Sequence, residues 1–166
     1  MVYGQKVGEL PEATRTGYSF LGWKNPSTGY YLSPTTTYNV ASDVTYYGDW
    51  SANSYKITFD ANGGTIGGSS KKEVSAKYDE IVGSKVASAG TPSMTGYTFA
   101  GWWTHQIGGT QITSSTTTKV TGNVTYYAHW TAITYKIRFH HNVSTDYYDG
   151  EVKCGDTNVA KTYYYE

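Results

Sequence analysis

Hydrophobic and polar residues alternate in several short runs of this chain, and a period of two predicts half-buried β-strands. The run at residues 55–59 (YKITF) is the clearest, because it places Tyr55, Ile57 and Phe59 on one face. We expect that face to point into a core. The run at residues 96–103 (GYTFAGWW) also alternates, with aromatic side chains at every second position of its first half.

Glycine and polar residues mark the turns between these runs. Residues 60–64 (DANGG) can supply the positive φ angles that a tight reversal needs. A second strand is predicted at about residues 72–78. A short helix is predicted within residues 79–90, where the apolar residues have roughly helical spacing. The threonine-rich stretch at residues 113–120 is a candidate for a short edge strand.

The run at residues 96–103 recurs near the start of the chain as residues 17–24 (GYSFLGWK). The two copies are 79 residues apart, which is the spacing of a repeat protein. Each copy holds an internal glycine, Gly22 or Gly101. A glycine inside a strand pattern predicts either a β-bulge or the close approach of a neighbouring ring or backbone.

Two further runs recur at a spacing of 80 residues. The run at residues 124–130 (VTYYAHW) repeats residues 44–50 (VTYYGDW), and residues 135–139 (YKIRF) repeat residues 55–59. The spacing predicts three domains, one for each copy. They are a first repeat without its opening strand at 1–54, a complete repeat at 55–134, and the opening strands of a third repeat at 135–166.

The first copy lacks the opening strand that the third copy supplies. This contrast suggests that residues 135–166 of one chain add a strand to the first copy of the next chain. The predicted assembly strand comprises Tyr135, Ile137, Phe139 and Val152. Ends that fall within a repeat by accident, or packing within one chain, explain the same pattern.

Composition agrees with short strands and tight turns, because 16% of residues are aromatic, 18 are Tyr and 19 are Gly. The formal net charge is zero, so we expect neither nucleic acid nor an anionic membrane as a partner. The longest apolar runs are too short to insert into a bilayer. The first residues do not begin a signal peptide, so a surface protein would need its targeting signal elsewhere.

The motifs at residues 59–64, 96–102 and 124–130 together resemble the Listeria–Bacteroides repeat, also called the internalin B-repeat family. The resemblance covers residues 2–139 in order and spacing. It implies an α+β, mostly β architecture of tandem small β-grasp (ubiquitin-like) modules. It also implies tandem arrays on the extracellular surface of bacteria or archaea, where the modules act as stalks, spacers or adhesive units. The family has no catalytic residues to transfer.

Candidate catalytic and metal sites are weak. His140 and His141 are adjacent in a predicted strand and point to opposite faces, so they cannot easily share a metal ion. Asp60 and Asn62 lack the further acidic ligands of a calcium loop. The single Cys154 excludes an intramolecular disulfide framework, and its role stays open. We therefore expect a non-enzymatic protein without metal or cofactor.

The recurring tryptophans, Trp23, Trp50, Trp102 and Trp130, are expected in the core. Other aromatic residues are candidates for exposed ligand contacts. They are Trp103, Tyr30, Tyr31, Tyr127, Tyr147 and Tyr148. Two functions follow. The chain is a cell-surface stalk or fibre subunit that contacts neighbouring copies or adjacent repeats, or it is an adhesin module that binds a host protein or polysaccharide.

Overall fold

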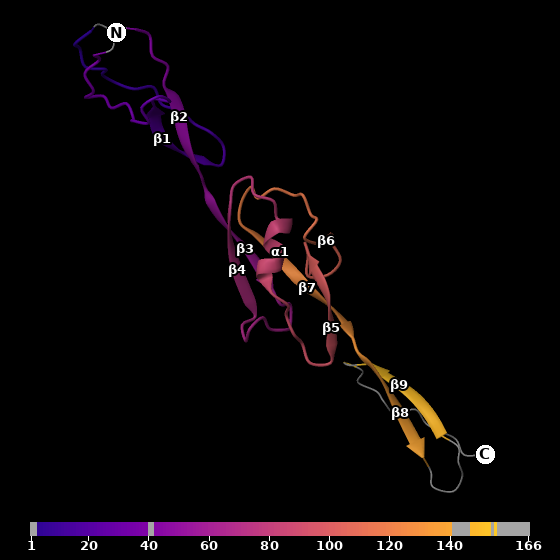
Figure 1. The fold of residues 1–166 in the computed structure, drawn as a ribbon. Helices are drawn as coiled ribbons and strands as arrows, with labels where there is room; N and C mark the ends of the chain where they lie inside the picture. Colours follow the sequence, from indigo (N-terminus) through magenta and orange to yellow (C-terminus); the bar gives the residue numbers. More distant parts are fainter. Residues whose placement is uncertain (1–2, 40–41, 141–146, 154, 156–166) are drawn as a thin grey trace. The chain divides into compact units, whose positions relative to one another are not determined.

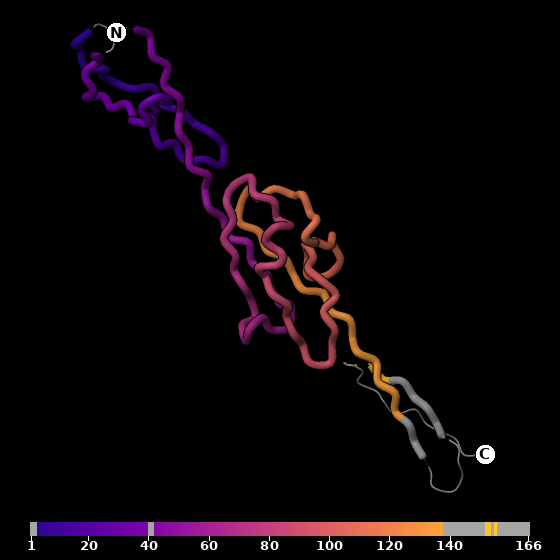
Figure 2. Tube along the Cα trace, viewed as in Figure 1, coloured from indigo at the N-terminus to yellow at the C-terminus, as the bar shows by residue number. Residues whose placement is uncertain are grey.

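The computed structural model describes residues 3–39, 42–140, 147–153 and 155, and it is mostly β (Figure 1). The sequence prediction of a mostly β class is confirmed. Figure 2 traces the chain through the same elements. In order they are β1 (Tyr18–Lys24), β2 (Tyr47–Ala52), β3 (Ser54–Asp60), β4 (Lys71–Lys77), α1 (Gly83–Ala89), β5 (Tyr97–Trp103), β6 (Gln111–Ile112), β7 (Val124–Ala132), β8 (Thr134–His140) and β9 (Tyr147–Lys153).

The chain divides into two compact units. The first unit comprises Met1–Tyr55, Ser75–Glu80 and Lys119–Gly122, and the second comprises Lys56–Val74, Ile81–Thr118 and Asn123–Glu166. The repeat boundaries predicted from the sequence stay predictions. Close to each predicted boundary, two strands are separated by a single residue. Asn53 separates β2 from β3, and Ile133 separates β7 from β8.

Most residues of a mixed sheet with the strand order β4-β3-β7-β5-β6 belong to the second unit. Strand β3 pairs with β7 in parallel, and β5 pairs with both β7 and β6 in antiparallel fashion. Helix α1 lies against this sheet (Figure 1). Two ion pairs cross from β3 to β4: Lys56 pairs with Glu73 at 2.6 Å, and Lys71 pairs with Asp60 at 3.1 Å.

The core of the second unit forms around Ile57 and Phe59, which are 0% exposed. The Phe59 ring centroid lies 5.0 Å from that of Trp102 and 6.0 Å from that of Tyr126. The predicted inward face of β3 is thus confirmed for Ile57 and Phe59, while Tyr55 is half-buried. Because aromatic pairs at these distances add to simple area burial, this cluster is a strong local contribution to stability.

Helix α1 falls within residues 79–90, as predicted. It begins at Gly83, a residue type that disfavours helix interiors. Here a glycine is required because there is no room for a side chain. A Cβ at this position would lie 2.5 Å from the Thr116 carbonyl oxygen and 2.6 Å from that of Ser114. The helix therefore begins where the backbone of the 114–116 turn approaches it directly.

The turn at residues 60–64 adopts the predicted positive φ at two positions, 46° at Asn62 and 96° at Gly63. Gly64 has a different role. A Cβ there would lie 2.5 Å from the Trp130 ring and 2.6 Å from the Ser93 carbonyl oxygen. The indole N–H of Trp130 donates to the Ala61 carbonyl oxygen at 3.0 Å, which fixes the turn against β7.

The edge strand predicted within residues 113–120 is misplaced. The structure places it at β6, where Ile112 is buried and pairs with Trp102. The threonine-rich stretch begins with a turn instead, because the Thr113 N–H donates to the Thr116 hydroxyl at 2.9 Å. Side chains of this kind compete with strand pairing by bonding their own backbone.

The first unit contains the antiparallel pair β1-β2. The ring of Phe20 packs against both Trp23 and Trp50, with centroids 5.3 Å and 5.0 Å away. The second unit repeats this arrangement with Phe99, Trp102 and Trp130. Trp102 is buried, whereas Trp23, Trp50 and Trp130 are half-buried.

Both tryptophan strands contain a bulge at the predicted glycine. The pairing register shifts between Phe20 and Gly22 in β1, and between Phe99 and Gly101 in β5. The two glycines have φ values of 135° and 134°. These lie in the region that residues with a Cβ rarely adopt.

A tyrosine cluster completes the first unit. The ring of Tyr78 covers Gly17, where a Cβ would lie 2.2 Å from ring carbons. Tyr78 also meets Tyr18 edge-on, at a centroid distance of 5.5 Å, and approaches Tyr55 at 6.5 Å. A glycine at position 17 is therefore needed for this packing.

Candidate functional site

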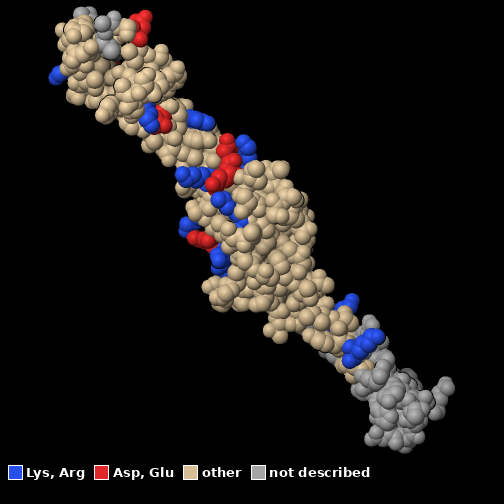
Figure 3. Space-filling view, in the orientation of Figure 1, with Lys and Arg blue, Asp and Glu red and all other residues tan. Residues whose placement is uncertain are grey.

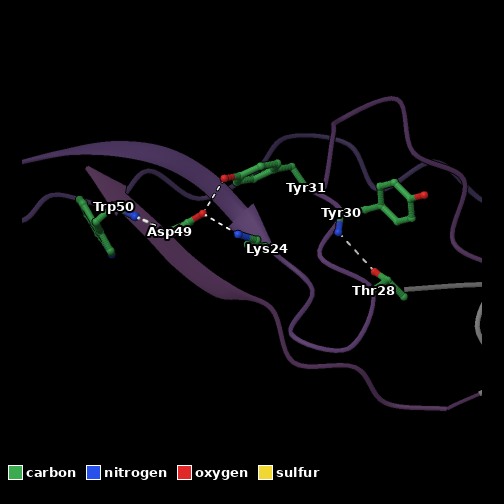
Figure 4. Close-up of polar contacts among 6 residues, drawn as sticks. All are labelled: Lys24, Thr28, Tyr30, Tyr31, Asp49 and Trp50. Atoms are coloured by element: carbon green, nitrogen blue, oxygen red, sulfur yellow. Dashed lines mark hydrogen bonds and ion pairs between the residues drawn. The ribbon is translucent and has the colours of Figure 1, made fainter. Parts of the chain in front are cut away.

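A polar cluster lies beside the bulge of β1 (Figure 4). The Tyr31 hydroxyl donates to Asp49 Oδ2 at 2.5 Å, and Lys24 Nζ approaches the same oxygen at 3.1 Å. The Tyr31 ring covers Gly22, where a Cβ would lie 3.1 Å from its Cδ1. The bulge therefore provides the space that lets Tyr31 reach Asp49 in β2.

The three groups shift one another's pKa. The hydrogen bond from Tyr31, then that from Lys24, lowers the pKa of Asp49. The hydrogen bond to Asp49 raises the pKa of both Tyr31 and Lys24. All three shifts favour one state, with a carboxylate, a neutral phenol and an ammonium group. This arrangement leaves no group ready to exchange a proton near neutral pH, so it suits a structural contact rather than acid–base chemistry.

The corresponding place in the second unit has different chemistry. Trp103 stands where the first unit has Lys24, and it stacks on His129, the counterpart of Asp49, with a centroid distance of 4.3 Å and an interplanar angle of 4°. His129 Nε2 lies 2.9 Å from the His105 carbonyl oxygen. Trp103 and His129 are each half-buried. Part of the Trp103 surface is thus used within the unit.

The candidate ligand-contact residues occupy separate places. Tyr30 is 78% exposed and points away from the polar cluster, while Tyr31 is 47% exposed and belongs to it (Figure 4). Within the second unit, Tyr127 is half-buried and is the strand partner of Trp103. Tyr147 and Tyr148 lie in β9, and their side chains are outside the described residues.

A cavity of about 320 Å³ opens in the first unit. It is lined by Val7, Leu32, Tyr38, Asp43, Val44 and Tyr46. Most of these side chains are apolar, and none of the six is fully buried. The sequence analysis did not identify this set. A residue-by-residue comparison of the copies could have found it, because several of its members correspond to core residues of the second unit.

The predicted assembly strand is part of a hairpin. β8 pairs with β9 in antiparallel fashion, with Tyr135 opposite Val152 and Ile137 opposite Gly150. Tyr135 is 52% exposed, and Ile137 and Val152 are half-buried. Phe139 lies in β8, and its side chain is outside the described residues. Apolar surface on this hairpin is therefore accessible.

Charged side chains are sparse on the face that Figure 3 shows, and several of them lie beside a side chain of opposite sign. Lys119 and Asp79, for example, form an ion pair at 3.1 Å. Among the described residues, no three His, Cys, Asp or Glu side chains gather as a metal site would require. His141 and Cys154 lie outside those residues.

The helix that the structure describes is too short and too polar to cross a membrane, and the described residues contain no other candidate span.

Comparison with known families gives a match to the Listeria-Bacteroides repeat domain over residues 1–48 and 55–129. The chain is 34% identical to internalin H of Listeria monocytogenes over 75% of its own length and 21% of that protein. It is 29% identical to a Gly-rich membrane protein of Evansella cellulosilytica, over 86% of this chain and 16% of that protein. A second membrane protein of that organism is 31% identical over 77% of this chain and 19% of its own length.

The chain thus spans about a fifth or less of the length of these relatives. No solved structure matches it significantly.

Proposed function

Because this chain belongs to the Listeria–Bacteroides repeat domain family, we propose that it is a non-enzymatic, tension-carrying segment of an extracellular cell-surface protein. In this proposal each complete repeat is a small β-grasp module, and the modules form a stalk. Consecutive modules are joined through single residues, Asn53 and Ile133, and chains join end to end by strand addition. The repeat occurs in membrane-associated and internalin proteins, which supports this setting.

The observation that carries the proposal is the pairing of β3 with β7. These strands are the first and last of the second repeat, and they are parallel neighbours, with Ile57 opposite Val124 and Phe59 opposite Tyr126. Tension applied through the chain pulls β3 toward its N-terminal end and β7 toward its C-terminal end. The hydrogen bonds between parallel strands are then loaded together in shear, rather than broken one at a time.

Single-molecule pulling tests this geometry. Cysteine handles at Lys56 and Thr134, both exposed, load the β3–β7 pair in shear, with Cys154 replaced by Ser. Handles at Thr98 and Thr131, which face each other across β5 and β7, instead open an antiparallel pair from one end. We expect the unit to unfold at a force several times higher when it is pulled through residues 56 and 134 than through residues 98 and 131. The reason is that the unfolding rate under force depends on the barrier along the pulled direction.

Pulling through residues 98 and 131 is the matched control, because the same unit is unfolded and only the points of attachment differ. Equal forces in the two geometries would contradict a tension-carrying role.

The alternative function is adhesion to a host protein or polysaccharide, and exposed aromatic rings favour it. Tyr30 at 78% exposure is the best candidate, since its ring is accessible on the surface. Tyr30→Ser and Trp103→Ala variants, compared with the wild-type chain on glycan arrays and host cells, separate the functions. Binding by the wild type that both variants lose supports adhesion, whereas unchanged signals favour the stalk.

A further inference from the structure

The first repeat has an open cavity where the second repeat has a filled core. Four lining residues match apolar or aromatic residues of the second repeat: Val7 matches Val82, Leu32 matches Ile112, Val44 matches Val124 and Tyr46 matches Tyr126. The counterparts of Val7, Leu32 and Tyr46 are at most 5% exposed. The Val7 N–H donates to the Thr36 carbonyl oxygen at 2.9 Å, and the Val82 N–H donates to that of Thr118 at 2.8 Å. The two acceptors are not counterparts, since Thr116 corresponds to Thr36.

In the second repeat this space is covered by β3. Phe59 is fully buried and contacts Tyr126, and Ile57 is fully buried opposite Val124. In the described part of the first repeat, β2 pairs with β1, and no strand lies along its other edge. The cavity thus has the place and the apolar lining of a missing β3-like strand.

The last strand of each repeat, β2 or β7, also differs in length between the two repeats. β7 is nine residues long and begins at Val124, whereas β2 is six residues long and begins at Tyr47. The residues of β7 that pair with β3 are 124–127. Their counterparts are 44–47, and residues 44–46 are not in a strand. β2 is therefore shorter than β7 over the residues that correspond to the β3-paired part of β7.

From these observations we infer that the cavity of the first repeat binds β8 of a second copy of this chain, as a strand parallel to β2. This inference rests on the proposed stalk function and names the partner of its end-to-end contact. β8 has the β3 sequence at four of five positions, with YKIRF in place of YKITF. β8 also pairs with β9, as β3 pairs with β4.

The register follows from the second repeat. Ile137 lies opposite Val44, so that the Ile137 side chain of the donor enters the cavity, and position 139 falls opposite Tyr46. The added hairpin gives the strand order β9-β8-β2-β1, which reproduces β4-β3-β7-β5. Strand addition of this kind gains backbone hydrogen bonds along the edge and specificity from alternate side chains.

A polar contact is also in place for this strand. In the second repeat, Asn123 Oδ1 accepts the backbone N–H of Lys56 at 2.8 Å. The counterpart of Asn123 is Asp43, which is exposed at the edge of the cavity. The counterpart of Lys56 is Lys136. The Asp43 carboxylate therefore accepts the Lys136 N–H of the docked copy, in a charge-assisted hydrogen bond.

Light scattering on the full chain tests the inference. The wild type is expected to associate as concentration rises, because a head-to-tail contact continues from copy to copy. Ile137→Asp in the donor and Val44→Asp in the acceptor should each give monomers at every concentration. The matched controls are Thr134→Asp and Thr45→Asp, which place the same charge on the opposite strand face and should associate like the wild type.

Mixing the two disrupted variants provides a rescue. The Ile137→Asp chain keeps its cavity and the Val44→Asp chain keeps its β8, so together they should form a 1:1 dimer and nothing longer. A wild type that stays monomeric, or variants that associate as it does, would overturn the inference. The pulling experiment on residues 56–134 uses one chain only, so a failure of docking leaves its result unchanged.

Discussion

The two tryptophan-containing copies share their aromatic packing and differ in what covers it. In both, a phenylalanine contacts two tryptophans beside a glycine bulge, as with Phe20 and Gly22 in the first unit. The second unit adds β3, β4 and α1, and its core is buried. The first unit keeps the same scaffold with an open cavity. The aromatic scaffold is therefore a local motif, and closure of the core depends on the opening strand.

The same comparison shows that the backbone scaffold is shared by the two copies, whereas the side chains beside it differ. The bulge is kept in both copies, while the residues beside it change from Lys24 and Asp49 to Trp103 and His129. One pair forms an ion pair and the other an aromatic stack at the same strand positions. The repeat thus specifies where a contact across the strands occurs, and leaves its chemistry free to vary.

The largest expected effect comes from removing the residue that most clearly distinguishes the two units. Phe59→Ala deletes a fully buried ring that contacts Trp102 and Tyr126. We expect the second unit to lose about 3–5 kcal/mol of unfolding free energy, as for buried aromatic truncations in general. Denaturant unfolding followed by tryptophan fluorescence measures it. Tyr47→Ala, at a 61% exposed position, should change little, and equal losses would refute this account of the core.

A smaller effect is expected at the start of α1, an element that the first unit does not show among its described residues. Gly83→Ala inserts a methyl group 2.5–2.6 Å from two backbone carbonyl oxygens. Such overpacking should cost about 1–3 kcal/mol, measured by thermal or denaturant unfolding. Gly122→Ala is the control, because a Cβ there has no neighbouring atom within 4 Å. The packing explanation fails if both variants behave alike.

The smallest effect is a pH dependence specific to the first unit. Because the pKa of Asp49 is lowered on folding, its contribution to stability is present above the unfolded pKa and is lost as the pH falls through the folded pKa. Tyr31→Phe removes the largest cause and should raise that pKa toward its ordinary value, as NMR titration of the carboxyl carbon would measure. Tyr30→Phe, whose ring points away, should leave it unchanged (Figure 4).

Much of the fold could be predicted from alternation and recurrence. The period of two located β5 at residues 97–103, and the recurring glycines at 22 and 101 indicated the bulges. The edge strand was misplaced because β6 has two residues, which is too short to show a period. Its position depends on the burial of Ile112 against the sheet, a tertiary effect that local propensity does not carry.

The candidate sites were harder to predict from the sequence. The contact of Tyr31 with Asp49 joins residues 18 positions apart, and it depends on the space left by Gly22. No local pattern encodes that geometry. The cavity was missed for a different reason, since an apolar residue such as Val44 looks like a core residue until the strand that should cover it is considered.

The single-residue connections also bear on resistance to proteolysis. Asn53 donates its backbone N–H to the Gly17 carbonyl oxygen, and Ile133 donates in the same way to Gly96, each at 2.9 Å. A protease needs several residues of unbound, extended chain to reach its cleavage geometry, and it finds these mainly at exposed loop tips. Each connection is one residue long and is bonded within its own unit, so the stretch between modules does not offer the ready cutting point that a longer interdomain linker would.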